Sequence, residues 1–359
     1  MTRINKIAII VGVIIIAVIA FFVFRKVEVN KPYKILSPVM IAEDGVAFPT
    51  LSVNEQSILF FNTTKNKLQQ ISLANNQISD ILDETIAGVY DVTWSPTKDQ
   101  AIIGTSKQEG GDYTKTIYLL DMAAKTITPL ASSKIESVAW SPDGSQIAYT
   151  FMVDENNVDI STAKPDGSGW KNVGQIKSLG APISIMWAGN QIKVFKPFYN
   201  PPESYDLTDQ EKQSVLYTIN LSNNKTSPSN LGQTADLKYS PDGQFYVQSQ
   251  EGDEGNSFSI SSQSGNHPVE ASLDSLSSTV WSKNSQNLYD IANNNNAATK
   301  KVLALYQIET SDFTVKKLVD FALPDLDEKS YFIDNLMVTE NENYLFFTRQ
   351  NTLYSYRIK

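Results

Sequence analysis

Residues 138–151 read VAWSPDGSQIAYTF, and this stretch decides the fold that we expect for the whole chain. Two short β-rich runs flank the sequence Ser-Pro-Asp-Gly at positions 141–144. In such a turn, proline presets φ, aspartate bonds to its own backbone and glycine accepts the left-handed conformation. The stretch therefore predicts two antiparallel strands joined by a tight turn.

Copies of this stretch recur along the chain. VTWSPTKDQAIIGT at 92–105 and LKYSPDGQFYVQS at 237–249 are close copies, and four weaker ones bring the total to seven, spaced 42 to 57 residues apart. The aligned position is held by Ser52, Ser95, Ser141, Ala188, Ser240, Ser282 and Thr339. A period in this range is typical of propeller blades or helical arrays, and β-rich runs broken by turns favour the propeller.

Each repeat is interpreted as one blade of four antiparallel strands. In the third repeat the expected strands are 135–141, 146–153, 158–163 and 171–176. The last repeat offers only three strands, so we expect Tyr33–Ile41 to supply its fourth, which leaves no open sheet edge. The predicted fold is all-β: a seven-bladed β-propeller of four-stranded antiparallel blades over residues 33–359, preceded by one transmembrane helix.

The residue before the aligned position is large and apolar or aromatic in every repeat. These residues are Leu51, Trp94, Trp140, Trp187, Tyr239, Trp281 and Val338. A recurring aromatic could stack against a cofactor, but packing between blades accounts for it better, because neighbouring blades diverge and a large wedge fills the gap. We interpret the series as structural.

The sequence Trp-Ser-Pro-Asp-Gly followed by an Ile-Ala-Tyr strand, at 140–149, resembles the WD-like repeat of TolB-type propellers, and 239–247 resembles it as well. The resemblance covers residues 33–359, although the first, fourth and seventh repeats depart from it in the turn. TolB-type proteins are extracytoplasmic protein-binding scaffolds, so the resemblance implies a similar role. TolB itself also has a separate α/β domain before its propeller, for which this sequence has no room.

Residues 7–24, IAIIVGVIIIAVIAFFVF, are apolar throughout. As a helix at ~1.5 Å per residue they span ~27 Å, enough for a bilayer core. The alternative is a cleavable signal peptide with Val18 and Ala20 at the cleavage site, but the apolar run continues past that site. We expect a single-pass anchor in the cytoplasmic membrane, with residues 1–6 inside, a linker at 25–32 and the propeller outside, because long C-terminal domains translocate largely regardless of charge.

Composition excludes several classes of function. The net charge of -9 repels phosphate backbones, so nucleic acid is not expected as a partner. Cysteine is absent, and the single histidine, His267, is interpreted as a surface residue in a turn, which excludes thiolate chemistry and histidine-based triads. Phosphate-binding loops and nucleophile-elbow motifs are also absent. We expect no enzymatic activity, no cofactor and no metal.

Four residues before the aligned position, small polar side chains recur and are expected to ring the mouth of the channel. They are Asp91, Ser137, Ser184, Asp236, Ser278 and Asn335. Such a ring could bind a metal or a polar ligand, but channel mouths are wet and Ca²⁺ takes six or more oxygens. Asp91 and Asp236 are the one candidate carboxylate pair, and we expect them to lie farther apart than the ~5–9.5 Å that glycosidases need.

Connections between the second and third strands lie on the same face as this mouth, and they are long and acidic. The fourth repeat's connection, KPFYNPPESYDLTDQEK at 196–212, adds aromatic residues and prolines. Stiff aromatic loops lose little entropy on docking, so they suit a binding surface. The expected binding residues are Phe198, Tyr199, Glu203, Tyr205 and Asp206.

The function expected from these features is that of a non-enzymatic, membrane-tethered, extracytoplasmic protein-interaction scaffold of a bacterial envelope. A basic partner would complement the acidic loops. The alternative is a small-molecule or metal-dependent hydrolase that acts at the polar mouth.

Overall fold

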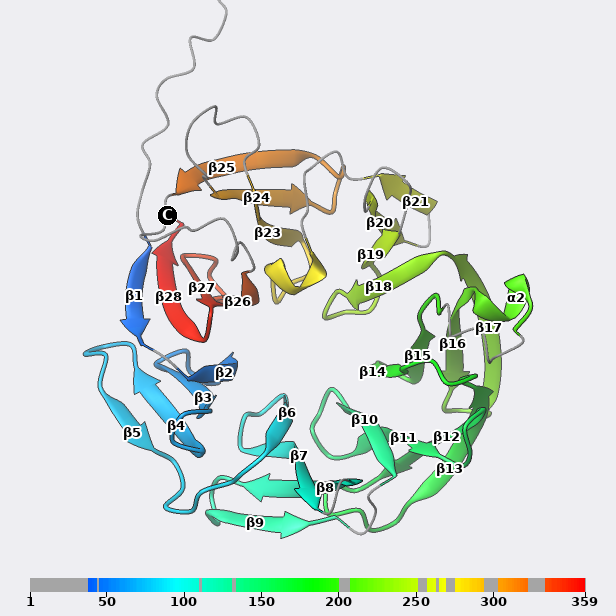
Figure 1. The fold of residues 1–359 in the computed structure, drawn as a ribbon. Helices are drawn as coiled ribbons and strands as arrows, with labels where there is room; N and C mark the ends of the chain where they lie inside the picture. The colour runs from blue at the N-terminus through cyan, green and yellow to red at the C-terminus, as the bar shows by residue number, and fades with distance from the viewer. Residues whose placement is uncertain are drawn as a thin grey trace, which may run out of the picture.

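Seven four-stranded antiparallel sheets stand around a central opening as the blades of a propeller, which confirms the predicted architecture (Figure 1). The computed structural model describes residues 38–43, 45–109, 112–130, 134–199, 207–250, 257–262, 265–268, 275–293, 303–321 and 333–358. The predicted anchor, 7–24, and linker, 25–32, lie outside this part of the chain. Within it, no helix is long and apolar enough to cross a membrane.

In each blade the first strand lies nearest the central opening and the fourth lies at the outside of the ring (Figure 1). Blade 1 contains β2 (Val46–Leu51), β3 (Ser57–Asn62), β4 (Lys67–Ser72) and β5 (Ile78–Asp80). Blade 2 contains β6 (Val89–Trp94), β7 (Gln100–Glu109), β8 (Asp112–Asp121) and β9 (Thr126–Pro129). Blade 3 contains β10 (Ile135–Trp140), β11 (Ile147–Met152), β12 (Asn157–Ala163) and β13 (Lys171–Lys177). Blade 4 contains β14 (Ser184–Ala188), β15 (Gln191–Lys196), β16 (Ser214–Asn220) and β17 (Lys225–Gly232), with the helical turn α2 (Asp209–Lys212) between β15 and β16.

Blade 5 contains β18 (Thr234–Tyr239), β19 (Tyr246–Gln250), β20 (Ser257–Ser262) and β21 (Gly265–Pro268). Blade 6 contains β22 (Thr279–Trp281), β23 (Asn287–Asn293), β24 (Leu303–Glu309) and β25 (Val315–Phe321), preceded by the short 3-10 helix η1 (Leu276–Ser278). Blade 7 contains β26 (Asp334–Val338), β27 (Tyr344–Arg349), β28 (Thr352–Arg357) and β1 (Val39–Ala42).

Both ends of the described chain contribute to the last blade. β1 pairs antiparallel with β28, with Val39 opposite Ser355 and Met40 opposite Tyr354. Figure 1 shows the blue first strand beside the red last one. The predicted closing strand is therefore confirmed, with its observed bounds at Val39–Ala42, while residues 33–37 lie outside the described chain.

In six of the seven blades, the side-chain hydroxyl at the aligned position stabilises the turn after the innermost strand, whether or not the turn contains glycine. In six repeats the aligned serine or threonine oxygen accepts a hydrogen bond from the backbone N–H five residues later, at 2.9–3.2 Å. The residue three positions after the aligned one has φ between 54° and 71°: these residues are Glu55, Lys98, Gly144, Gly243, Ser285 and Glu342. Only two of them are glycines, so the local hydroxyl bonds hold the same turn even where the sequence departs from Ser-Pro-Asp-Gly.

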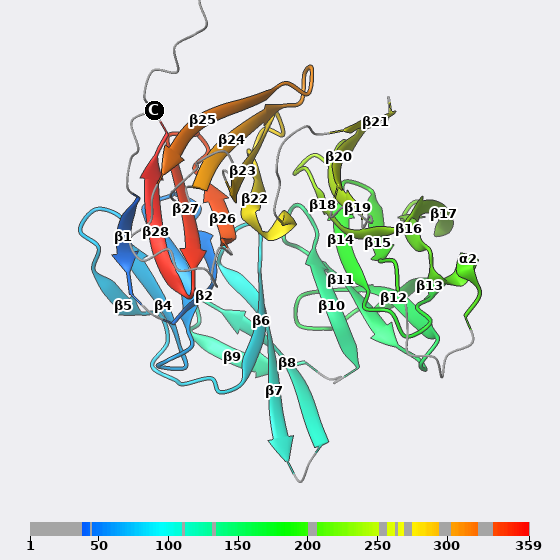
Figure 2. The same ribbon diagram turned by 45° about the horizontal axis from the view of Figure 1, so that its top comes forward.

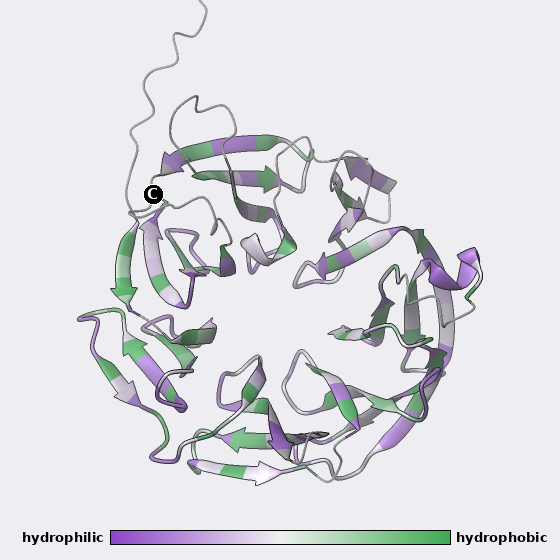
Figure 3. Cartoon of the chain, in the orientation of Figure 1, coloured by the Kyte–Doolittle hydropathy of each residue, from purple (hydrophilic) through white to green (hydrophobic). Residues whose placement is uncertain are grey.

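Hydrophobic and hydrophilic residues alternate along many of the strands, as the coloured bands in Figure 3 show. Six clusters of buried apolar residues each join two neighbouring blades. One of them packs Ile102 and Ile117 of blade 2 against Trp140 and Ile147 of blade 3. None of these six clusters, formed by the described residues, joins blade 4 to blade 5.

Three tryptophans of the wedge series also bond to the preceding blade. Trp94 Nε1 donates to the carbonyl of Phe48, Trp140 Nε1 to Thr93 and Trp281 Nε1 to Lys238, at 2.9–3.1 Å. Trp187 differs, because its Nε1 donates to Gly189 within its own blade. The structural interpretation of the series is consistent with these contacts.

Candidate functional site

The predicted mouth residues lie at irregular points of the innermost strands. The pairing of the first two strands shifts register there in blades 1, 2, 3, 5 and 7. Asp91, Ser137, Asp236 and Asn335 fall within or at the edge of these irregularities. β-bulges redirect side chains and are frequent at binding sites. Backbone geometry at the mouth therefore departs from regular pairing in several blades.

The six predicted side chains do not share one environment. Asp91, Ser184, Asp236 and Asn335 are exposed, and Ser137 is half-buried. Ser278 is only 2% exposed, lies in η1 and donates a hydrogen bond of 2.8 Å to Asp290. The expectation that Ser278 lines an open mouth is wrong, because the preceding turn is coiled into η1 and directs the hydroxyl into the blade.

Carboxylates at the mouth have altered acidity. Loss of hydration raises the pKa of Asp91, and the hydrogen bond from Thr93 Oγ1 at 3.1 Å only partly opposes this. The pKa of Asp236 is also raised by loss of hydration, although the N–H of Leu237 donates to it at 2.7 Å. Both side chains remain exposed, so the neighbouring protein displaces part of their water without enclosing them.

Lys238 links this region to blade 6. Its Nζ donates to the carbonyl of Thr279, and burial lowers its pKa to about 8 against the opposing attraction of Asp236 and Asp290. Asp290 is fully buried on β23. The result is a charged network between β18 of blade 5 and the first two strands of blade 6.

Possible metal ligands are scattered. In the parts of the chain that the structure describes, no group of three or more His, Asp or Glu side chains could hold a metal ion. His267 lies in β21 and not in a turn, and its ring stacks on Phe313 with centroids 3.8 Å apart. It is half-buried in blade 5, so its interpretation as a plain surface residue is wrong.

The connections between the second and third strands of the blades lie on one face of the ring, here called the loop face. Its described residues include 106–109, 112–115, 153–157, 196–199 and 207–213. Its most prominent feature is a hairpin in blade 2. The sequence suggested a loop at SKQEGGDYTK, but β7 and β8 stay paired from Gln100 opposite Asp121 out to Glu109 opposite Asp112. Figure 2 shows this hairpin projecting well beyond the ring.

The hairpin presents an aromatic residue that the sequence analysis did not single out. Tyr113 is 69% exposed, the largest exposed fraction among the large apolar side chains. At the base, Tyr90 packs over Gly104, where an added Cβ would lie 2.7 Å from the tyrosine Cζ, and Lys115 Nζ lies 5.8 Å from the Tyr90 ring centroid. The signal that could have found Tyr113 is the alternation of residues 112–121, which continues the strand pattern into the supposed loop.

The connection of blade 4 has a firmly held base. The N–H of Phe198 donates to the Thr234 carbonyl of blade 5, and that of Tyr199 donates to the Lys212 carbonyl. Lys196 is only 3% exposed and donates to the carbonyls of Glu211 and Gln213 at 3.0 and 2.7 Å.

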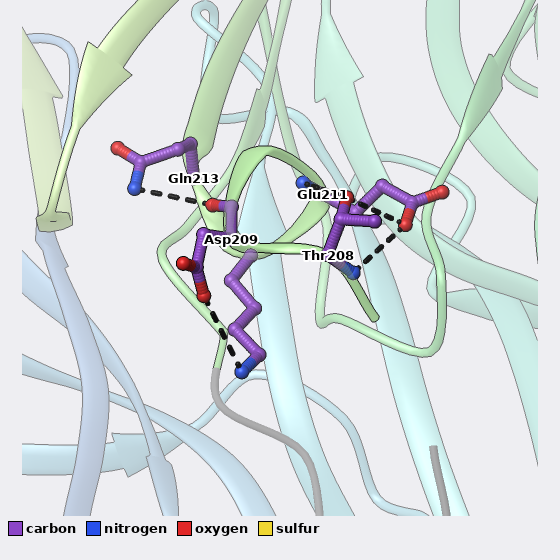
Figure 4. Close-up of polar contacts among 5 residues, drawn as sticks. Thr208, Asp209, Glu211 and Gln213 are labelled. Atoms are coloured by element: carbon purple, nitrogen blue, oxygen red, sulfur yellow. Dashed lines mark hydrogen bonds and ion pairs between the residues drawn. The ribbon is translucent and has the colours of Figure 1, made fainter. Parts of the chain in front are cut away.

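The helical turn α2 closes this base. Thr208 and Glu211 form a reciprocal capping box, which Figure 4 shows together with the Gln213–Asp209 bond and the Asp209–Lys212 contact. Hydrogen bonds from Thr208 lower the pKa of Glu211 and keep it charged. The ends of the connection are therefore fixed before any partner binds.

The predicted loop residues are placed only in part. Phe198 and Tyr199 are half-buried, so they support the loop base as well as offering some aromatic surface. Glu203, Tyr205 and Asp206 lie outside the described residues.

Comparisons of sequence identify no relatives. No protein-family model matches this chain. No curated protein matches it either.

Many solved structures share the fold. An oligogalacturonate lyase in complex with manganese has a TM-score of 0.61 at 10% identity, over 89% of this chain and 91% of that one. A prolyl endopeptidase has a TM-score of 0.52 at 10% identity, over 86% of this chain and 48% of that one. TolB from Acinetobacter baumannii is also among them, with a TM-score of 0.48 at 14% identity over 72% of this chain. The matched part spans 62% of that TolB chain. At these identities the similarity establishes the propeller fold alone.

Proposed function

We propose that this protein is a non-enzymatic interaction scaffold of a bacterial cell envelope, which binds a protein partner through the loop face. The observation that carries the proposal is the β7–β8 hairpin, which extends beyond its blade and exposes Tyr113. Exposed aromatic residues on a rigid support make efficient interface anchors, because they bury a large area at a small entropic cost. A two-stranded hairpin is such a support.

The blade 4 connection adds a second point of contact to the same face. Its base is fixed by the Phe198, Tyr199 and Lys196 bonds and by the capping box of α2. Preorganised segments need less ordering when they bind. The chain carries a net charge of -9, which favours a partner with a basic contact surface and predicts that salt weakens association.

The experiment is a pulldown from solubilised envelopes with the full-length chain as bait. Tyr113→Ser should remove the specific partner while the melting temperature stays nearly unchanged, because the side chain lies outside the blades. Tyr344→Ser is the matched control. Tyr344 is 41% exposed but begins β27, at the opposite face of the ring, so the partner should be retained. If both variants retain every partner, the loop face is not the interface.

Tethering to the cytoplasmic membrane, with the propeller outside, is the second part of the proposal and rests on the apolar run 7–24. Protease added to intact spheroplasts should digest the propeller without prior lysis. Protection until the spheroplasts are lysed would place the propeller on the cytoplasmic side and contradict this part.

A second candidate is a hydrolase at the mouth, favoured by the raised pKa values of Asp91 and Asp236, since shifted carboxylates are frequent in active sites. A mouth ligand must stabilise the folded state by mass action. Thermal shift with Ca²⁺, Mn²⁺ and oligosaccharides tests this. A shift that the Asp91→Asn and Asp236→Asn variants abolish would favour the hydrolase over the scaffold.

A further inference from the structure

A pocket of about 300 Å³ lies between the outer parts of blades 2 and 3. β9, the outermost strand of blade 2, has four residues and pairs only with Tyr118–Asp121 of β8, whereas β13 of blade 3 has seven residues. The outer edge of blade 2 is therefore too short to cover the facing surface of blade 3. None of the pocket's residues belongs to the channel mouth or to the loop face.

Alternation along two strands of blade 3 supplies most of the lining. Ile147, Tyr149 and Phe151 of β11 point to the same side, toward blade 2, where Ile147 joins the apolar cluster shared with that blade. On the next strand Ser161 lies opposite Tyr149, and Asp159 lies opposite Phe151. The pocket thus has an apolar floor with one carboxylate set beside aromatic rings.

Trp170 forms part of the wall and is 68% exposed. It is the one tryptophan outside the wedge series and lies in the connection between β12 and β13. A large aromatic side chain that is exposed beside an apolar cavity is typical of a ligand site. A bound ligand would cover the aromatic surface that the protein itself leaves exposed to water.

The carboxylate of Asp159 in the pocket lining favours a ligand with a positive charge. Its Oδ1 accepts from Gln175 Nε2 at 2.8 Å, and Oδ2 has no hydrogen-bond partner among the described residues. Lys134 Nζ already lies over the ring of Phe151, 5.9 Å from its centroid, so the aromatic rings left to a ligand are those of Tyr149 and Trp170. Aromatic faces attract cations, and a carboxylate beside them adds a hydrogen-bond acceptor.

We propose that this pocket binds a small organic cation, an amine joined to an aromatic ring. The ring would lie against Trp170 and Tyr149, and the ammonium would donate to Asp159 Oδ2. At about 30 Å³ for each water-sized group, the volume has room for roughly ten non-hydrogen atoms. That size fits a phenylalkyl amine.

The test uses three probes with the same ring and different charge: phenethylamine, 2-phenylethanol and phenylacetate. Binding to the full-length chain is followed by tryptophan fluorescence and calorimetry. Phenethylamine should bind in the millimolar range or tighter, the alcohol about five- to thirty-fold more weakly, and phenylacetate most weakly of the three. Trp170→Phe should remove the fluorescence change that reports binding.

Asp159→Asn should leave the affinity for 2-phenylethanol unchanged. It should lower the affinity for phenethylamine to about the same value. Asp166→Asn is the matched control. Asp166 is an exposed aspartate in the adjacent connection that accepts from the Ser168 N–H and does not line the pocket, so the preference for the amine should persist. Equal binding of amine and alcohol to the unmodified protein, or a preference that survives in Asp159→Asn, would overturn the proposal. Absence of binding by all three probes would overturn it as well.

Discussion

Two interfaces of the same ring, between blades 2 and 3 and between blades 4 and 5, differ in the polar side chains that they bury. The first packs Ile102, Ile117 and Ile147 around Trp140, whose Nε1 donates to Thr93 of the neighbouring blade at 2.9 Å. In the second, Tyr239 takes the place of Trp140, and its hydroxyl is buried without a hydrogen-bond partner among the described residues.

Other polar side chains face the same interface. Gln248 follows Val247, which packs toward blade 6, so Gln248 points toward blade 4. Its Oε1 is buried and has no hydrogen-bond partner in the part of the chain that the structure describes. From blade 4, Lys193 points toward blade 5, donates to Thr218 Oγ1 at 3.0 Å and has its pKa lowered by burial. We call this polar interface the seam.

The difference teaches that repeat position alone does not fix the strength of an interface. Buried apolar area contributes about 25 cal/mol per Å², whereas a buried polar atom without a partner costs about 1–3 kcal/mol. We therefore expect the seam to be the weakest of the seven interfaces. The hydrogen bond from the Phe198 N–H to the Thr234 carbonyl crosses the seam. The seam therefore lies directly beside the base of the blade 4 connection.

The largest loss of stability is expected when the ring is opened at blade 7, away from the seam. Removing residues 38–43 deletes β1, which leaves β28 with an unpaired edge and takes Ala42 out of the cluster shared by blades 7 and 1. The protein should aggregate or lose its cooperative melting transition, as measured by size-exclusion chromatography and calorimetry. Removal of residues 1–32 is the control and should leave a folded propeller. If the two truncations behave alike, closure by β1 is not what holds the ring.

The next effect compares two tryptophans of the wedge series. Trp140→Ala should lower the free energy of unfolding by about 3–5 kcal/mol, the usual range for a buried large aromatic. Trp187→Ala should cost about 1–2 kcal/mol, because this side chain is only half-buried and bonds within its own blade. Chemical denaturation measures both. Equal losses would show that the bond to the preceding blade and the deeper burial of Trp140 are unimportant.

A matched pair of conservative changes tests the seam directly. Tyr239→Phe removes the unpartnered hydroxyl and should raise the free energy of unfolding by about 1 kcal/mol. Trp140→Phe removes a satisfied N–H together with part of the wedge and should lower it by about 1–3 kcal/mol. The two signs should therefore be opposite. Destabilisation by Tyr239→Phe would contradict the polar character assigned to the seam.

The smallest effect concerns charge at the mouth, in the two blades that carry Asp91 and Asp236. The pKa of each carboxyl is raised in the folded state, so at neutral pH the ionised carboxylate lowers the free energy of unfolding. This loss disappears once the pH falls below the pKa that the carboxyl has in the unfolded chain, because both states are then protonated. Asp91→Asn should therefore melt slightly higher than the unmodified protein at pH 7, and the difference should shrink as the pH falls toward about 3. If Asp91→Asn instead melts lower than the unmodified protein at pH 7, and this deficit disappears on acidification, the fold stabilises the carboxylate.

Much of the fold could be predicted because its determinants are local. The strands of blade 3 were placed within one or two residues, and the closing strand was found by counting strands in the last repeat. The prediction that glycine is needed in the turn was wrong for several repeats. Lys98 and Glu342 adopt the left-handed conformation at the position that glycine takes in Ser-Pro-Asp-Gly. The hydroxyl at the aligned position holds that turn by bonds that span only a few residues.

The candidate sites were less predictable. Ser278 was assigned to the mouth by its spacing, but η1 turns it inward. Tyr113 was passed over because glycines and charges suggested a loop where two strands remain paired. Spacing gives the position of a residue in a repeat, but not the local irregularity that decides where its side chain points.

By itself the sequence determined the number of blades and their four-stranded composition, because period and alternation act within a single repeat. The closing strand followed from counting the strands of the last repeat. Only the tertiary structure decided which interface is apolar and which is a seam, which mouth residues reach water, and where a pocket opens beside Trp170. The physical reason is separation along the chain. These features join side chains from different strands and different blades, and no local pattern records which of them meet.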